Sequence, residues 1–447
     1  MSGLSMRMFD YRGVQVADYY RALAQRGRSL FRRPIAAADG AADIEQLARR
    51  LLSNRGEASG VALAAGLVQA WRALDTEGQL QWFLTLAKQF GPDEKNLDTA
   101  VEEWRRERSP EAAARLAIAS EPRRQELMRR INLAPRGTAA LVSMRAELLK
   151  LVKQHPGLGI VDQDFVHLLG SWFNRGFLLM SPIDWSSPAA TLEKIIRYEA
   201  VHEIKGWDDL RRRLQPLDRR CFAFFHPQMP DEPLIFVEVA LAEGIPRRID
   251  DLLGGGGNTI PPTTANSAVF YSISNTQVGL KGISFGNFLI KQVVEDLLRE
   301  LPNLNTFVTL SPIPGFSRWL HDRMATDKKV ADRVELLTQP NWAESDTDTR
   351  LSSWLAEEAA EYLVRARDDN GRPLDPVARF HLGNGARLEQ INVNADHSER
   401  GLQQSFGMMV NYLYDLEAIE ANHEAYANRG SVVCSRAVQR LLAARQD

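Results

Sequence analysis

The spacing of apolar residues changes partway along this chain, and the change predicts two kinds of structure. Between residues 37 and 177, apolar residues recur three and four positions apart, which is the period of amphipathic helices. The pattern is clearest in the segments 43–54, 80–90, 99–107, 123–133 and 140–154. Asp43, Asp93 and Ser109 precede helical runs and are residue types that cap helix starts. The first part of the chain is therefore predicted to be a helical bundle.

After Arg220 the pattern becomes that of short strands. Runs rich in β-branched or aromatic residues are bounded by Pro, Gly or Asn at 221–227, 234–241, 268–274 and 306–312. An apolar helical stripe lies at 287–301, so the last two of these strands are expected to pair in parallel through a crossover helix. Farther along, 351–369 predicts a helix, and 387–393 and 408–414 predict strands. The stretch 250–266 is rich in Gly and Pro and predicts a mobile loop.

The length of the chain supports a division into two domains. With 447 residues it exceeds the size at which a single core keeps growing. We expect an α plus α/β architecture, with a helical domain over 1–180 and a mixed-sheet domain over 181–447. No internal repeat is visible.

Composition and charge limit the partners and the compartment. A formal net charge of -2 gives no global basic field of the kind that nucleic-acid binders use, so any anion site must be local. The N-terminus shows no signal peptide and no early apolar run is long enough to span a bilayer, so we expect a cytoplasmic protein. Cys221 and Cys434 form no metal-binding motif, so neither a disulfide framework nor a zinc site is expected.

The sequence Gly-Ile-Ser-Phe-Gly at 282–286 has two functional interpretations. It matches the nucleophile elbow of serine hydrolases, but an elbow needs a strand that runs directly into it, and the predicted strand ends about ten residues earlier. It also resembles a loop that holds a phosphate at a helix start, where free backbone N–H groups and Lys281 favour an anion. On the local pattern alone, an ordinary loop before a helix remains open.

Two residues stand out as catalytic candidates, although each also has a structural explanation. Ser311 follows a predicted strand, which is the usual place for function in an open α/β sheet. A serine that ends a strand is nevertheless often structural. His381 lies near Gly383 and Gly385, where a substrate can approach closely, although a single histidine beside apolar residues is more often part of the packing. His226 also ends a predicted strand and is the main rival.

Four longer segments of the sequence together indicate one family. The segments 268–294, 307–320, 375–392 and 401–416 together resemble the malonyl-CoA decarboxylase family. The similarity covers most of the chain from Cys221 to Leu416, and the helical first half matches the layout of the family. The resemblance implies a helical domain that supports oligomerisation, followed by a catalytic domain of the GNAT fold that binds the CoA pyrophosphate on a loop and helix start.

The resemblance also implies the site residues. The GNAT loop pattern falls on Lys281, Ser284 and Gly286, with Ser284 in place of the usual first glycine. The backbone rather than the Ser284 side chain is therefore expected to hold the phosphates. The implied substrate-binding residues are Lys281, Gly282, Ile283, Ser284, Phe285, Gly286 and Asn287. The catalytic pair of the family falls on Ser311 and His381.

Members of this family convert malonyl-CoA and a proton to acetyl-CoA and carbon dioxide, which links them to malonate and fatty acid metabolism. No cofactor and no metal is implied, because the thioester itself accepts the electrons. Pro312 has no N–H for an oxyanion hole, so we expect Ser311 to bind the substrate rather than carry an acyl group. His381 is expected to deliver the proton. From the last predicted strand, Asn411, Tyr412 and Tyr414 are candidates to line the acyl pocket, and core packing explains the two tyrosines equally well.

Two other functions compete with decarboxylation. One is a GNAT-type acyltransferase that moves an acyl group from CoA to an amine. The other is a non-catalytic acyl-CoA sensor that uses the helical half as a partner surface. We expect malonyl-CoA and acetyl-CoA as ligands, a homo-oligomer as the assembly, and no nucleic acid or membrane as a partner.

Overall fold

The chain folds into two compact units that do not follow one simple cut in the sequence. The computed structural model describes residues 41–53, 56–254, 259–283, 289–337 and 349–445. One unit runs to Leu179 and also includes Phe225–Pro233 and Gln277–Phe285, which come from the second half of the sequence. The other unit holds Met180–Phe224, Leu234–Thr276 and Gly286–Asp447. The prediction of a helical domain followed by a mixed-sheet domain is confirmed.

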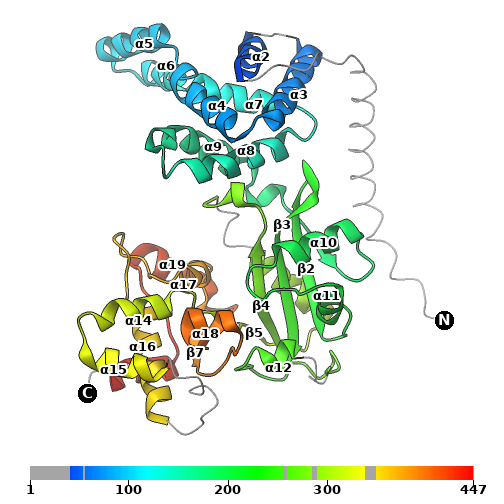
Figure 1. The fold of residues 1–447 in the computed structure, drawn as a ribbon, viewed down its shortest axis with the longest axis vertical. Helices are drawn as coiled ribbons and strands as arrows, with labels where there is room; N and C mark the ends of the chain where they lie inside the picture. Colours follow the sequence, from blue (N-terminus) through cyan, green and yellow to red (C-terminus); the bar gives the residue numbers. More distant parts are fainter. Residues whose placement is uncertain (1–40, 54–55, 255–258, 284–288, 338–348, 446–447) are drawn as a thin grey trace, which may run out of the picture. The chain divides into compact units, whose positions relative to one another are not determined.

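The first unit is helical, as its 3.6-residue period predicts. Its elements are α2 (Ala41–Ser53), α3 (Glu57–Ala73), α4 (Thr76–Gln89), α5 (Glu94–Glu107), α6 (Pro110–Ser120), α7 (Arg123–Asn132), α8 (Gly137–Leu151), η1 (Pro156–Leu158), α9 (Gly159–Trp172) and η2 (Arg175–Phe177) (Figure 1). Asp93 and Ser109 cap α5 and α6 by accepting backbone N–H groups of the first turn. The expectation that Asp43 is a cap was wrong, because α2 already begins at Ala41. Among the described residues, no helix is long and apolar enough to cross a membrane.

The second unit combines strands and helices. Its strands are β1 (Leu179–Ile183), β2 (Arg219–His226), β3 (Met229–Ala242), β4 (Ser267–Asn275), β5 (Thr306–Thr309), β6 (Ser311–Pro312), β7 (Arg387–Asn392) and β8 (Met409–Leu413). Its helices are α10 (Ala189–Tyr198), α11 (Trp207–Leu214), α12 (Asp250–Leu253), α13 (Leu289–Glu300), α14 (Phe316–Met324), α15 (Lys328–Leu337), α16 (Thr349–Val364), α17 (Pro376–Gly383), α18 (Glu399–Ser405), α19 (Ile419–Arg429) and α20 (Arg436–Ala444). The 3-10 turn η3 (Val278–Leu280) follows β4 and belongs to the helical unit.

The sheet has the order β1-β2-β3-β4-β5-β8-β6, and β7 pairs with β8. β4 and β5 are parallel and are joined through α13, so the predicted crossover is confirmed. The stretch 306–312 was predicted as one strand, but it forms β5 and β6. The strand is interrupted at Leu310, whose N–H donates to the carbonyl oxygen of Phe270 in β4. The next residue, Ser311, pairs with Val410 of β8.

Two other expectations needed correction. The stretch 250–266 is not only loop, because it starts with α12, and Leu252 of that helix is buried in a core with Val269, Val308 and Met409. Residues 255–258 of the stretch lie outside the described residues. The helix predicted over 351–369 ends at Val364.

A β-bulge in β4 sends neighbouring side chains to opposite faces of the sheet. Ser272 pairs with Glu238 and Phe270 pairs with Val239, so Tyr271 is the extra residue. Glu238 and Val239 are consecutive, so their side chains point to opposite faces of the sheet, and each paired residue of β4 points to the same face as its partner. As a result, Ser272 lies on the same face as Glu238, which Arg213 of α11 contacts, whereas Phe270 lies on the same face as Thr309, which bonds to Ser311.

Candidate active site

Ser311 is the first residue of β6 and follows the end of β5 by two positions. It is buried, with 6% of its surface exposed, and its position is fixed by pairing with β8. Its Oγ donates a hydrogen bond to Thr309 Oγ1 at 2.9 Å. Thr309 Oγ1 also accepts the backbone N–H of Tyr412 at 3.1 Å, which ties the serine to two strands. The hydroxyl therefore has a defined orientation.

His381 lies in the last turn of α17. Asp375 starts this helix by accepting the N–H groups of Val377 and Ala378, and Pro376 occupies the first position. From the sequence, His381 was expected beside glycines open to substrate. Instead, Gly383 is the last helical residue, and a Cβ on Gly385 would overlap the carbonyl oxygen of Ile419. Gly385 thus serves the packing of α17 against α19, and the approach of a substrate at Gly383 stays a prediction.

Ser311 and His381 are 70 positions apart in sequence, and the structure brings them together. His381 Nε2 lies 3.2 Å from Ser311 Oγ, and His381 Nδ1 lies 2.8 Å from the hydroxyl of Tyr414. Because the Ser311 hydroxyl donates its hydrogen bond to Thr309, the serine oxygen must accept a hydrogen bond from His381 Nε2–H. Nδ1 of the neutral ring is then unprotonated and accepts a hydrogen bond from the Tyr414 hydroxyl. The hydrogen bonds thus run in one direction, from Tyr414 through His381 and Ser311 to Thr309.

Burial keeps this chain of groups neutral. The loss of solvent lowers the pKa of His381 to about 3 and raises the pKa of Tyr414 well above its ordinary value. The His381 ring stacks on Tyr412, with centroids 4.6 Å apart and planes inclined by 24°. The hydroxyl of Tyr412 is buried and has no hydrogen-bond partner among the described residues. It is a polar group that remains available to a ligand.

Asn411 has a different role from its neighbours. Its side-chain NH₂ donates to the carbonyl oxygens of Thr309 and Pro246, and its oxygen accepts from Asn392. Asn411 is fully buried, so these bonds join β5, β7 and β8. The structure assigns it to the core rather than to an acyl pocket.

The predicted phosphate loop is described only in its first part. Lys281 and Gly282 are exposed, and Ile283 is buried. Ser284, Phe285, Gly286 and Asn287 lie outside the described residues. β4 ends at Asn275, so Ser284 does not follow a strand directly, as a nucleophile elbow requires.

His226, the rival histidine, uses both ring nitrogens within the helical unit. Its Nδ1 accepts the N–H of Gln228 at 3.2 Å, so its Nε2 is the donor to the carbonyl oxygen of Trp172 at 3.1 Å. The ring also packs against Phe173, with centroids 4.7 Å apart. Burial lowers its pKa. These contacts make His226 a structural residue.

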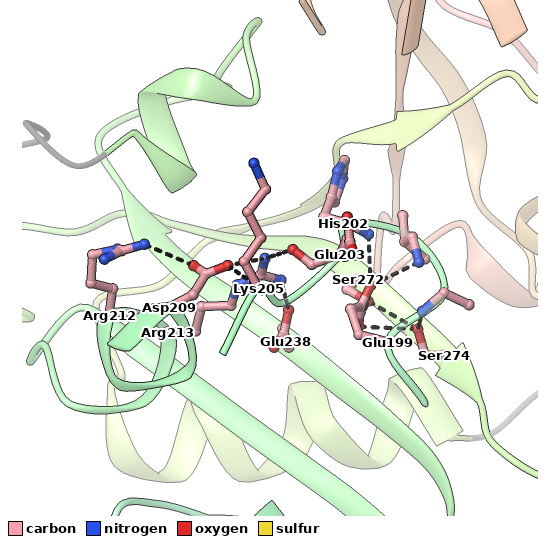
Figure 2. Close-up of polar contacts among 12 residues, drawn as sticks. Glu199, His202, Glu203, Lys205, Asp209, Arg212, Arg213, Glu238, Ser272 and Ser274 are labelled. Atoms are coloured by element: carbon pink, nitrogen blue, oxygen red, sulfur yellow. Dashed lines mark hydrogen bonds and ion pairs between the residues drawn. The ribbon is translucent and has the colours of Figure 1, made fainter. Parts of the chain in front are cut away.

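A second polar cluster, on the opposite face of the sheet, was not predicted from the sequence. We call Glu199, His202, Asp209, Arg213, Glu238, Ser272 and Ser274 the charged cluster. Figure 2 shows Arg213 between Asp209 and Glu238, with Nη1 of Arg213 3.1 Å from Glu238 Oε2. Glu199 accepts the hydroxyls of Ser272 and Ser274 at 2.8 and 3.2 Å. Glu238 was visible as a lone acid in an apolar run, but its partner Arg213 was not.

Two groups of the charged cluster, Glu238 and His202, have strongly shifted pKa values. Burial, with the nearby Glu199, raises the pKa of Glu238 to about 8 despite the opposing charge of Arg213. Burial lowers the pKa of His202 to about 4. Within the described residues, no three His, Cys, Asp or Glu side chains are grouped as a metal site requires.

Comparison with known proteins follows the same division of the chain. A family model described as the malonyl-CoA decarboxylase C-terminal domain matches residues 176–447, and one described as the N-terminal domain matches residues 90–173. The mitochondrial malonyl-CoA decarboxylase of Rattus norvegicus is 35% identical, covering 86% of this chain and 84% of its own length. That of Anser anser anser is 34% identical, covering 84% and 82%.

Solved structures agree at the level of the whole fold. The crystal structure of malonyl-CoA decarboxylase from Rhodopseudomonas palustris has a TM-score of 0.87 and 55% identity, covering 90% of this chain and 100% of that one. The enzyme from Agrobacterium vitis has a TM-score of 0.86 and 53% identity, covering 89% and 99%. Both units of this chain therefore have counterparts in solved structures.

Proposed function

Because this chain belongs to the malonyl-CoA decarboxylase family, we propose that it is a carboxy-lyase that converts malonyl-CoA and a proton to acetyl-CoA and carbon dioxide. The observation that supports this most directly is the buried pair of Ser311 and His381. Their side chains lie 3.2 Å apart, in a chain that resembles decarboxylases over most of its length. Acetyl-CoA as the product follows from the chemistry of the substrate.

The reaction breaks the bond between the malonyl carboxylate and the α-carbon. The electron pair moves into the thioester, which becomes an enolate, and a proton then adds to the α-carbon. The protein must hold the carboxylate in position and supply donors to the developing enolate oxygen. The Ser311 hydroxyl donates to Thr309 in the free enzyme and would supply such a hydrogen bond by rotating toward the substrate oxygen, and the free hydroxyl of Tyr412 offers a second polar contact.

Ser311 is less suited to be a nucleophile. A catalytic nucleophile gives its proton to a neighbouring histidine, but here Ser311 donates to Thr309 and accepts from His381. The following residue, Pro312, also lacks the N–H that an oxyanion hole would use. We therefore assign Ser311 a hydrogen-bonding role toward the substrate.

His381 supplies the proton. With a pKa of about 3 the ring is neutral before the substrate binds. A malonyl carboxylate close to the ring favours the charged form and raises this pKa. The ring then carries a proton that it can give to the α-carbon after carbon dioxide has left. The added proton enters at Nδ1, where the Tyr414 hydroxyl turns to accept it, and the proton on Nε2 is the one given to the α-carbon.

The CoA end is assigned to residues 281–287. The segment combines exposed Lys281 and Gly282 with a position shortly before the start of α13, where backbone N–H groups favour phosphate. Bound CoA should protect the peptide 277–290 of the wild-type enzyme in hydrogen–deuterium exchange. Ser284→Ala should keep most activity, because a backbone cradle does not need that side chain. If Ser284→Ala abolished turnover, the elbow interpretation would return.

Two further properties stay predictions, a cytoplasmic location and assembly into a homo-oligomer. The exposed residues Ile118, Leu133 and Ile160 of the helical unit offer apolar surface for such an assembly.

Incubation with malonyl-CoA alone tests the function. Release of carbon dioxide without an acceptor is expected of a decarboxylase. An acyltransferase would need an added amine, and a sensor would bind the thioester without turnover. Binding without carbon dioxide release would therefore overturn the proposal.

A further inference from the structure

One buried arginine of the helical unit holds the segment that precedes the predicted CoA loop. Arg145 of α8 is 2% exposed, and its Nη1 donates to the carbonyl oxygens of Gly279 and Lys281, both at 2.8 Å. Its Nε donates to Asp162 of α9, also at 2.8 Å. The guanidinium thus joins two helices to a segment more than a hundred residues away in sequence.

The same segment is held by packing. Gly279 lies so close to α8 that a Cβ on it would overlap the carbonyl oxygen of Val142. Leu280 and Ile283 are buried, with 3% and 7% exposed. Between them, Lys281 and Gly282 are exposed to solvent. The result is an exposed pair of residues carried on a buried anchor, which is what a preorganised ligand loop requires.

We infer that Arg145 is a positioning residue for CoA, through its hold on the backbone of Gly279 and Lys281. This rests on the proposed function, because it takes Lys281 and Gly282 as the start of the pyrophosphate loop. It gives the helical unit a direct part in substrate binding, beside the oligomerisation predicted for it. Arg145 itself makes no contact with the reacting atoms in this assignment.

The guanidinium is hard to replace in this position. It is planar, always charged, and donates in three directions from one rigid group. Without it, the backbone of the loop has to be ordered by CoA itself. The conformational entropy lost when about one residue becomes ordered lowers the affinity for CoA roughly tenfold. The KM for malonyl-CoA should therefore rise on the order of tenfold, while kcat at saturation changes less.

Arg124 offers a matched control. It is a buried arginine of the same unit, 5% exposed, and it pairs with Asp164 of α9 as Arg145 pairs with Asp162. Its guanidinium bonds to Asp164 and to none of the described residues of 277–283. Arg145→Met and Arg124→Met should lose similar stability, but only Arg145→Met should raise KM. Arg145→Lys should restore part of the affinity. Gly279→Ala, which displaces the same segment, should act like Arg145→Met.

A substrate without the nucleotide sharpens the test. Malonyl-pantetheine has no phosphates, so its kcat/KM should be the same in the wild-type enzyme and in Arg145→Met. An equal loss for both substrates, or a KM increase in Arg124→Met as well, would show a general structural role and overturn the inference. If wild-type exchange shows no CoA protection over 277–290, the loop assignment itself fails. If protection is present but Arg145→Met and Gly279→Ala bind CoA normally, only the role of Arg145 fails.

Discussion

Two buried polar clusters lie on opposite faces of the same sheet, and they differ in charge. The catalytic candidates Ser311, His381 and Tyr414 form a neutral chain of hydrogen bonds. The charged cluster instead holds Arg213 against Glu238, and Glu238 Oε1 has no hydrogen-bond partner among the described residues. Both clusters are buried. Only in the first does each ring nitrogen and hydroxyl group of the three residues form a hydrogen bond with another neutral group.

The difference teaches what each cluster can do. A neutral and fully hydrogen-bonded set can respond to a charged substrate, because the entering charge moves the pKa of His381. Arg213 is already held between Asp209 and Glu238, and buried charged groups of this kind often fix a structure rather than stabilise it. The charged cluster therefore suits a role in holding α11 against β3.

Loss of the neutral cluster should have the largest effect on turnover. Ser311→Ala and His381→Ala should each reduce kcat by a factor on the order of 100 or more, because a positioned proton donor or oxyanion donor contributes that much. The double variant should lose little more than either single one if the residues act together. Carbon dioxide release measures all three. Ser274→Ala, in the charged cluster, is the control and should keep near-normal turnover.

Removing one hydroxyl from the neutral chain should have a smaller effect. Tyr414→Phe keeps the ring that packs on Phe270 but deletes the donor to His381 Nδ1. We expect kcat to fall roughly tenfold, because the ring of His381 is no longer held in one tautomer. ¹⁵N NMR of the histidine should show protonated Nε2 in the wild type and a mixture in the variant. An unchanged spectrum would contradict a chain of hydrogen bonds that starts at the Tyr414 hydroxyl.

The two clusters should give stability opposite dependences on pH. The pKa of His381 lies below its ordinary value, so its unfolded form binds a proton that the folded form does not, and stability falls as pH drops from about 6.5 toward 3. The pKa of Glu238 lies above its ordinary value, so its contribution is complete below pH 4.5 and is lost as pH rises through about 8.

Urea unfolding between pH 5 and 8.5 separates these contributions. Glu238→Gln should flatten the decline on the alkaline side, and His381→Gln should partly flatten the decline on the acid side. The flattening is only partial because His202, with its pKa of about 4, acts in the same direction as His381. If Glu238→Gln left the alkaline decline unchanged, the carboxyl would be ionised already and paired with Arg213.

The cysteines should have the smallest effect of all. Cys221 is buried beside Glu238 and Cys434 is partly buried, and both are free thiols. Replacing both by serine should leave soluble expression and turnover within about twofold, since neither thiol belongs to the two clusters. Loss of soluble protein in the double variant would show that one of them is needed for packing.

Much of the fold followed from local patterns, and the exceptions have physical reasons. β2, β3, β4 and β8 appeared near their predicted positions because alternation and β-branched residues are local signals. The break between β5 and β6 depends on Leu310 bonding back to β4, which no local pattern contains. The helix α17 was missed although Asp375-Pro376 is a start signal that could have revealed it.

The candidate site was predictable in its members but not in its geometry. Ser311 and His381 were named from the family resemblance, whereas the direction of their hydrogen bonds depends on Thr309 and Tyr414. The charged cluster was invisible because Glu199, Arg213 and Ser272 come from three distant segments. Only the tertiary fold brings such residues together.

The two segments that the helical unit takes from later in the chain also determine when that unit can be completed. During synthesis, Phe225–Pro233 and Gln277–Phe285 leave the ribosome well after α8 and α9, several seconds later at about 5–20 residues per second. Until then, the surface of α8 that receives Gly279 is uncovered. The packing of the N-terminal half is therefore completed only late in synthesis, and we expect a fragment ending at residue 180 to expose that surface of α8 and to aggregate more readily.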